Sequence, residues 1–268
     1  MNLAAIQAFI FDMDGVLYRG DVAIPGAREF LADLMAGHIP FRLLTNNSSA
    51  TPEEYAARLA VMGISVAPEN IMTSALATAD YLAETSPGGG RVYAIGGEGV
   101  RDALRQRGFE LVPDAPADFV VVGIDWNVNY DLFRRANTAI RGGARFVGTN
   151  GDKTFPHPNG IVPGNGALLA FLETATGVKP TVIGKPSVAI FTQTAHSMGV
   201  PAEATAMVGD RLDTDIEGAA RAGMRSVFLL SGVHTRADLA WAPAQPDVVF
   251  DDIAALRAAW QGAVSAKL

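Results

Sequence analysis

Two aspartates separated by one residue stand near the start of the chain, in Asp12-Met13-Asp14-Gly15. Residues i and i+2 of an extended chain point to the same side, so both carboxylates can face one substrate. The glycine lets the backbone turn sharply and present N–H groups to an anion. With one carboxylate ionised and the other protonated, such a pair can attack phosphorus and donate a proton to the leaving oxygen. Taken alone, an aspartate at a strand end can equally cap a turn.

Polar residues follow three further apolar runs of the sequence. Thr45, Lys185 and Asp210 each come directly after such a run or one residue beyond it. Ligands of an open α/β sheet bind at the carboxyl ends of its strands. Four separate strands or loops would therefore deliver these side chains and Asp12 to one crevice. Each placement alone is weak evidence, whereas the four together are hard to assign to chance.

Short apolar runs alternate with helical patterns along the chain, as is typical of α/β proteins with parallel strands. The runs lack polar alternation, which is expected of strands covered by helices on both faces. We expect strands at residues 8–11, 41–44, 205–208 and 226–230. We expect helices at residues 26–35, 52–62, 188–198 and 214–222.

The middle of the chain has a strand–helix alternation of its own. It predicts strands at residues 91–95, 119–124 and 145–148, and helices at 100–107, 130–141 and 167–176. A turn-rich segment runs from residue 149 to residue 166. From the usual size of domains we infer an inserted domain over residues 80–180, within a core made of residues 1–79 and 181–268. Hinges would then lie near residues 78–81 and 177–182.

Composition limits the classes of function. The 268 residues are 49% hydrophobic and 18% charged, which is enough apolar material for a buried core. The net charge of −7 argues against a nucleic-acid surface, and the absence of cysteine excludes thiol chemistry. The four histidines show no metal-ligand spacing, so we interpret them as surface or packing residues. No run approaches the ~18 apolar residues of a membrane helix, and no secretory signal is apparent, so we expect a cytoplasmic protein.

Four segments, in order, resemble the motifs of the haloacid dehalogenase-like (HAD) hydrolases. They are FIFDMDGVLYRG, LLTNN, VIGKP and MVGDRLDTDI. An insertion between the second and third, with GTNGDKTFP and GIVPGNGALL, resembles the NagD and 4-nitrophenylphosphatase-like subfamily, subclass IIA. The resemblance covers the whole chain and implies an α/β fold. The core would be a Rossmann-like parallel sheet, and the insertion an α/β cap domain.

This resemblance implies a role for each motif residue. Asp12 would attack phosphorus and form an aspartyl-phosphate, while Asp14 would act as general acid and then as general base. Thr45 would bind phosphate through its hydroxyl and Asn46 through its backbone N–H. Lys185 would neutralise charge on the phosphoryl oxygens and on Asp12. Such a division suits a reaction that depends on positioning and charge neutralisation.

The resemblance also implies a Mg²⁺ site. Its ligands would be the carboxylates of Asp12 and Asp210 and the backbone carbonyl of Asp14, with Asp215 holding the metal's waters or contacting a ligand. An all-oxygen ligand set with retained waters suits Mg²⁺. Asp213 stands just before a Thr-x-x-Glu sequence that predicts a capping box at a helix start, so we interpret it as structural.

The implied function is Mg²⁺-dependent hydrolysis of a small phosphorylated metabolite. Sugar phosphates, nucleoside monophosphates, phosphoglycolate and pyridoxal phosphate remain open as substrates, and the resemblance allows a homodimer. Halide displacement and P-type ATPase chemistry are disfavoured, because those branches lack an acid/base aspartate at the position of Asp14. Two alternatives stay open. One is a phosphomutase, and the other is a catalytically silent, phosphate-binding regulatory protein.

Overall fold

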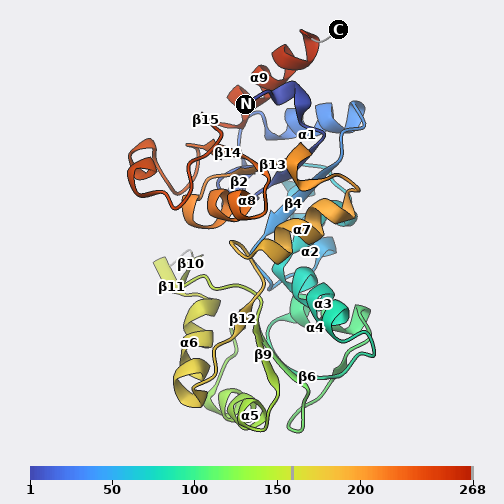
Figure 1. Ribbon diagram of the computed structural model, residues 1–268, viewed down its shortest axis with the longest axis vertical. Helices are drawn as coiled ribbons and strands as arrows, with labels where there is room; N and C mark the ends of the chain where they lie inside the picture. Colours follow the sequence, from blue (N-terminus) through green and yellow to red (C-terminus); the bar gives the residue numbers. More distant parts are fainter. Residues whose placement is uncertain (158–159, 267–268) are drawn as a thin grey trace. The chain divides into compact units, whose positions relative to one another are not determined.

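The computed structural model describes residues 1–157 and 160–266 and contains two sheets of parallel strands flanked by helices (Figure 1). The predicted α/β class is therefore confirmed. The chain divides into two compact units. The first comprises Met1–Thr45, Tyr55–Met72 and Phe191–Leu268, and the second comprises Asn46–Glu54 and Thr73–Ile190. The inserted domain predicted at residues 80–180 falls within the second unit.

A six-stranded sheet forms the centre of the first unit. Its order is β15 (Val248–Phe250), β14 (Arg225–Leu229), β13 (Thr205–Gly209), β1 (Ala8–Phe11), β4 (Phe41–Thr45) and β5 (Ile71–Thr73). Pairing from β15 to β4 is parallel throughout. Every residue of β1 and β13 is buried, which accounts for their uninterrupted apolar sequences. These two central strands carry the residues of greatest chemical interest at their carboxyl ends.

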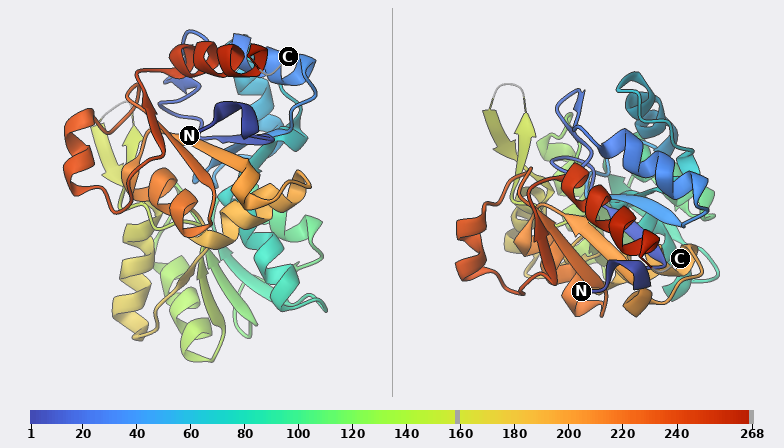
Figure 2. Two further views of the ribbon diagram at one scale, coloured as in Figure 1. Left: turned by 45° about the horizontal axis from the view of Figure 1, so that its top comes forward. Right: turned by 90° about the horizontal axis from the view of Figure 1, so that it is seen from above.

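Helices cover both faces of this sheet. They are α1 (Ala27–Ala36), α2 (Pro52–Val61), α7 (Val188–Ser197), α8 (Glu217–Arg221) and α9 (Ile253–Ser265). Helices α1 and α9 lie side by side (Figure 2). The ring centroid of Phe9 in β1 lies 5.4 Å from that of Phe30 in α1 and 6.2 Å from that of Trp260 in α9. The β1–β4 and β13–β14 connections run in opposite directions along the sheet. Because such crossovers are right-handed, their helices α1 and α8 cover opposite faces.

The second unit contains a five-stranded, all-parallel sheet. Its order is β12 (Thr181–Val182), β9 (Arg145–Gly148), β8 (Phe119–Val122), β6 (Arg91–Ile95) and β7 (Glu110–Leu111). Its helices are α3 (Ser74–Thr85), α4 (Glu98–Gln106), α5 (Tyr130–Arg141) and α6 (Asn165–Thr176). Apolar residues of α5 and α6 pack against alternate residues of β6 and β8 and form one core. An antiparallel hairpin of β10 (Thr154–His157) and β11 (Gly160–Pro163) precedes α6.

Most predicted elements are found with ends that differ by no more than two residues, but the helix predicted at 214–222 differs in kind. It begins as a π-helical turn, Leu212–Ile216, and continues as α8. The predicted capping box is wrong, because Arg211 is the N-cap and makes no side-chain cap hydrogen bond. Thr214 lies inside the turn and is buried. Strands β5 and β15 and helices α3 and α9 were not predicted.

Within residues 1–157 and 160–266, no helix combines the length and the apolar character needed to cross a membrane.

Candidate active site

Three residues with reactive or hydrogen-bonding side chains lie at adjacent strand ends of the six-stranded sheet. Asp12 follows β1, Asp210 follows β13, and Thr45 is the last residue of β4. Strand β1 lies between β13 and β4 and is parallel to both, so the three carboxyl ends are neighbours. The N–H of Asp12 donates to the carbonyl of Val208 at 2.8 Å, which continues the β1–β13 ladder beyond β1. Ordinary sheet hydrogen bonding therefore places Asp12 beside the strand that leads to Asp210.

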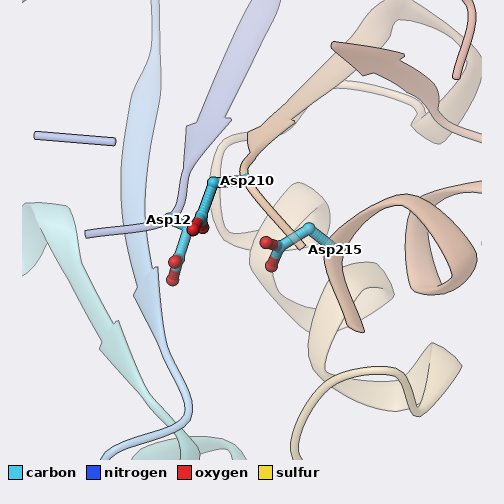
Figure 3. Close-up of side chains that lie close together, drawn as sticks. All are labelled: Asp12, Asp210 and Asp215. Carbon is cyan, nitrogen blue, oxygen red and sulfur yellow. The ribbon is translucent and has the colours of Figure 1, made fainter. Parts of the chain in front are cut away.

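A cluster of three buried carboxylates lies at this edge (Figure 3). Asp12, Asp210 and Asp215 each offer one oxygen, and these oxygens lie within 4.8 Å of one another. The three residues are 9%, 1% and 0% exposed. Like charges held together away from water destabilise one another, and a bound cation offsets that repulsion. Because all three donors are oxygens, the set fits a hard divalent cation such as Mg²⁺.

The π-helical turn brings Asp215 to the other two aspartates. The N–H of Ile216 donates to the carbonyl of Arg211 at 3.2 Å, a bond that spans five residues. Within the same turn, the N–H of Arg211 donates to the carboxylate of Asp215 at 3.1 Å. The Arg211 guanidinium pairs with Asp213 at 3.0 Å. Asp213 thus contacts its own turn, in keeping with the structural role inferred for it.

A loop at residues 231–234, which no sequence motif indicated, supports Asp210. The N–H of Val233 donates to the Asp210 carboxylate at 2.6 Å, and that of His234 to the Asp210 carbonyl at 3.3 Å. The Nδ1 atom of His234 accepts the N–H of Leu212 at 2.9 Å, so this histidine is neither a surface nor a simple packing residue. The position of the loop in the sequence could have indicated it, because the loop follows the apolar strand β14 of the same sheet.

Gly232 of this loop lies against Asp210, and its substitution is a test of the cluster. A Cβ atom at Gly232 would overlap the carboxyl group and Cβ of Asp210. We therefore expect Gly232→Ala to displace Asp210 and to weaken Mg²⁺ binding about tenfold or more, because the carboxylate would lose both its place and its bond to Val233. Calorimetric titration with Mg²⁺ measures the effect. Gly262→Ala is the matched control, since nothing lies within 4 Å of a Cβ there; equal affinities in the two variants would contradict the prediction.

Asp14 lies on the exposed side of the segment that follows β1. Met13, between the two aspartates, is 1% exposed and points into the core, whereas Asp14 is exposed. The N–H of Gly15 donates to the carbonyl of Tyr18 at 2.8 Å and closes the turn into the hairpin of β2 (Tyr18–Arg19) and β3 (Val22–Ala23). Partial desolvation raises the pKa of the Asp14 carboxyl, and the nearby Arg58 guanidinium opposes that rise. A raised pKa favours the protonated form that a proton donor needs.

Asn46 and Lys185 belong to the second unit. Lys185 follows β12, which pairs with β9 in the five-stranded sheet, so its strand belongs to a different sheet from the strands that lead to Asp12, Thr45 and Asp210. A two-residue strand carries too little pattern to reveal its partner. Lys185 is 4% exposed, and its backbone pairs with the side chain of Asn46.

Two family models match this chain. The family model described as haloacid dehalogenase-like hydrolase matches residues 9–110, and one described as HAD-hydrolase-like matches residues 182–256. An acid sugar phosphatase of Staphylococcus epidermidis is 38% identical over 247 residues, which cover 92% of this chain and 95% of the relative.

Two solved structures extend the similarity to the fold. The 4-nitrophenylphosphatase of Thermotoga maritima superposes with a TM-score of 0.92 at 34% identity, over 97% of this chain and all of the other. NagD of Escherichia coli K-12 superposes with a TM-score of 0.87 at 38% identity, over 93% and 97% of the two chains. The chain belongs to the haloacid dehalogenase-like hydrolases, in the NagD-like subfamily.

Proposed function

We propose that this hydrolase is a Mg²⁺-dependent phosphatase of small phosphate monoesters, with sugar phosphates as its substrate class. One observation carries the proposal: the buried carboxylates of Asp12, Asp210 and Asp215 meet within 4.8 Å, and Asp14 stands two residues beyond Asp12. The names of the relatives support the chemistry, since they include an acid sugar phosphatase and a 4-nitrophenylphosphatase.

The first step transfers phosphate to the protein. A carboxylate oxygen of Asp12 attacks phosphorus, the P–O bond to the alcohol breaks, and an aspartyl-phosphate forms. The protonated carboxyl of Asp14 donates its proton to the departing oxygen, so that the product leaves as a neutral alcohol. The partial desolvation that raises the pKa of Asp14 suits this donation.

The second step releases phosphate. Asp14, now ionised, accepts a proton from water, and the resulting hydroxide attacks phosphorus and restores Asp12. The side chains of Asp12, Asp210 and Asp215 and the backbone carbonyl of Asp14 are the groups proposed to hold Mg²⁺. When bound, Mg²⁺ would supply positive charge that offsets the charge on the phosphoryl oxygens.

Three further residues are proposed to bind the phosphoryl group. Thr45 donates its hydroxyl and Asn46 its backbone N–H, while the ammonium of Lys185 neutralises the negative oxygens. These contacts require positioning and charge rather than covalent chemistry, as a loose phosphoryl-transfer transition state does.

A metal-removal experiment on a substrate panel tests the proposal. We expect the purified protein to release inorganic phosphate from 4-nitrophenyl phosphate and from sugar phosphates in the presence of Mg²⁺. EDTA should remove the activity and added Mg²⁺ should restore it, because the clustered carboxylates need a cation to accept an anionic substrate. Phosphate release is followed colorimetrically, with nucleoside monophosphates, phosphoglycolate and pyridoxal phosphate in the same panel.

The panel also separates the alternatives. Activity that resists EDTA would refute the metal site. Transfer of phosphate to a second sugar, without release of inorganic phosphate, would indicate a phosphomutase. No turnover of any ester, together with measurable phosphate binding, would indicate the regulatory protein.

A further inference from the structure

The side chain of Asn46 pairs with both backbone polar groups of Lys185. Its Oδ1 atom accepts the Lys185 N–H at 2.7 Å, and its Nδ2 atom donates to the Lys185 carbonyl at 3.1 Å. Lys185 is 4% exposed, so its backbone must find partners within the protein rather than in water. Two hydrogen bonds from one planar amide fix the orientation of the residue at both of its peptide groups.

The residue before Lys185 must be small for this pairing to form. A Cβ atom at Gly184 would lie 2.7 Å from the Oδ1 atom of Asn46 and 2.6 Å from the carbonyl oxygen of Thr149. The N–H of Gly184 donates to that carbonyl at 2.8 Å, and the N–H of Ile183 donates to the carbonyl of Gly148 at 3.1 Å. The ladder of β12 and β9 thus continues to Gly184. Lys185 is held on one side by this ladder and on the other by Asn46.

Asn46 is itself fixed by neighbouring polar groups. Its carbonyl accepts from Nδ2 of Asn150 at 2.7 Å and from the hydroxyl of Ser74 at 2.5 Å. Its Nδ2 atom also lies 3.2 Å from each carboxylate oxygen of Asp152. The acceptors around Nδ2 set which way the amide faces, so its Oδ1 atom is presented to the N–H of Lys185.

Asn165, the first residue of α6, supports Asn150 in turn. It is 2% exposed, and its Nδ2 atom donates to the Asn150 carbonyl at 2.8 Å and to the Val122 carbonyl at 3.0 Å. Three amides, from Asn165 through Asn150 to Asn46, therefore form a continuous chain of contacts that ends at Lys185. Asn150 and Asn165 come from the segments GTNGDKTFP and GIVPGNGALL, to which the proposed reaction gives no role.

We propose that the side chain of Asn46 is a positioning residue for Lys185, and that Asn150 and Asn165 hold it in place. The inference rests on the proposed role of Lys185 in binding the phosphoryl group. It adds a side-chain function to a residue whose backbone N–H alone was expected to act. A long, flexible lysine side chain places its charge accurately only if its backbone is held. The amide chain provides that hold.

A double-mutant cycle on phosphate binding tests the inference. The variants are Asn46→Ala, Lys185→Ala and the double variant, and the probe is inorganic phosphate titrated calorimetrically in the presence of Mg²⁺. Asn46→Ala keeps the backbone N–H and removes only the amide. We expect it to weaken phosphate binding about tenfold, the scale for leaving buried backbone groups without partners. In the Lys185→Ala background the same substitution should change binding by less than about twofold, because residues that act through one group are not additive.

Two controls separate positioning from a general loss of structure. Asn129→Ala, which removes the N-cap side chain of α5 in the same unit, should leave phosphate binding unchanged. Mg²⁺ affinity should stay within about twofold of the parent in Asn46→Ala, because the substitution removes none of the groups proposed to hold Mg²⁺. If Asn46→Ala does not fold, Asn150→Ala replaces it, with a smaller loss and the same lack of additivity expected.

Each outcome decides one of the two proposals. If the double variant loses phosphate affinity by the product of the two single losses, the positioning role is overturned and the role of Lys185 stays intact. Unchanged phosphate binding in Asn46→Ala would lead to the same conclusion. Unchanged phosphate binding in Lys185→Ala would instead remove the proposed role of Lys185, on which the inference depends.

Discussion

The Asp12→Asn variant is expected to lose hydrolysis of 4-nitrophenyl phosphate by a factor of about 10⁴ or more, the scale on which removal of a catalytic nucleophile acts. An amide is a poor nucleophile towards phosphorus, so no aspartyl-phosphate can form. Asn also removes one negative charge from the cluster with Asp210 and Asp215. Steady-state rates at saturating Mg²⁺ measure the loss, and calorimetry shows how much of it arises from weaker metal binding.

Asp213→Asn is the matched control for this substitution. Asp213 lies in the π-helical turn that also carries Asp215, but its carboxylate pairs with the Arg211 guanidinium at 3.0 Å and is partly exposed. A pair of this kind contributes little to stability, and we expect the control to keep most of its activity. An Asp12→Asn variant as active as this control would rule out Asp12 as the nucleophile.

The Asp14→Asn variant is expected to separate the two chemical steps. Loss of the acid and base should lower kcat by about 10²–10⁴-fold for a sugar phosphate, whose alcohol needs a proton to leave. The loss in the first step should be smaller for 4-nitrophenyl phosphate, because nitrophenolate leaves without one. Without a base to activate water, the phosphorylated protein should accumulate. Stopped-flow absorbance should therefore show a burst of nitrophenolate equal to the protein concentration.

Measuring the Mg²⁺ affinity of Asp14→Asn distinguishes a loss of proton transfer from damage to the metal site. Asn at position 14 retains the backbone carbonyl proposed as a ligand, so Mg²⁺ affinity should change little. A variant that loses Mg²⁺ binding, slows both substrates equally and shows no burst would assign the Asp14 side chain to the metal site instead of to proton transfer.

The sequence predicted the layered α/β fold because its signals are local. The buried strands β1 and β13 are continuous apolar runs, and the helices after β4 and β6 have clear periodicity. Strands β5 and β15 have only three residues each. Their existence depends on pairing with a neighbouring strand, which no window of sequence contains.

Asp12 and Asp210 were equally open to prediction, because aspartates at the ends of apolar strands are visible without a structure, whereas Asp215 was expected only from the resemblance to the HAD motifs. The supports around them were not. The bond from Val233 to Asp210 uses a backbone N–H, a group that every residue except proline possesses. The sheet to which Lys185 belongs depends on the pairing of the two-residue strand β12. Residue type reveals which groups can react, whereas long-range backbone contacts decide how they are held.

The acidic cluster depends on the number of residues in the π-helical turn as well as on their identity. Asp215 reaches Asp210 because five residues, Leu212–Ile216, form one wide turn. Successive residues of a helix are rotated by about 100°, so removing one residue would carry Asp215 away from its partners. A deletion of Asp213 or Thr214 would thus disrupt the acidic cluster far more than a substitution at either position. Among relatives, we expect substitutions in Leu212–Ile216 to be more frequent than insertions or deletions there.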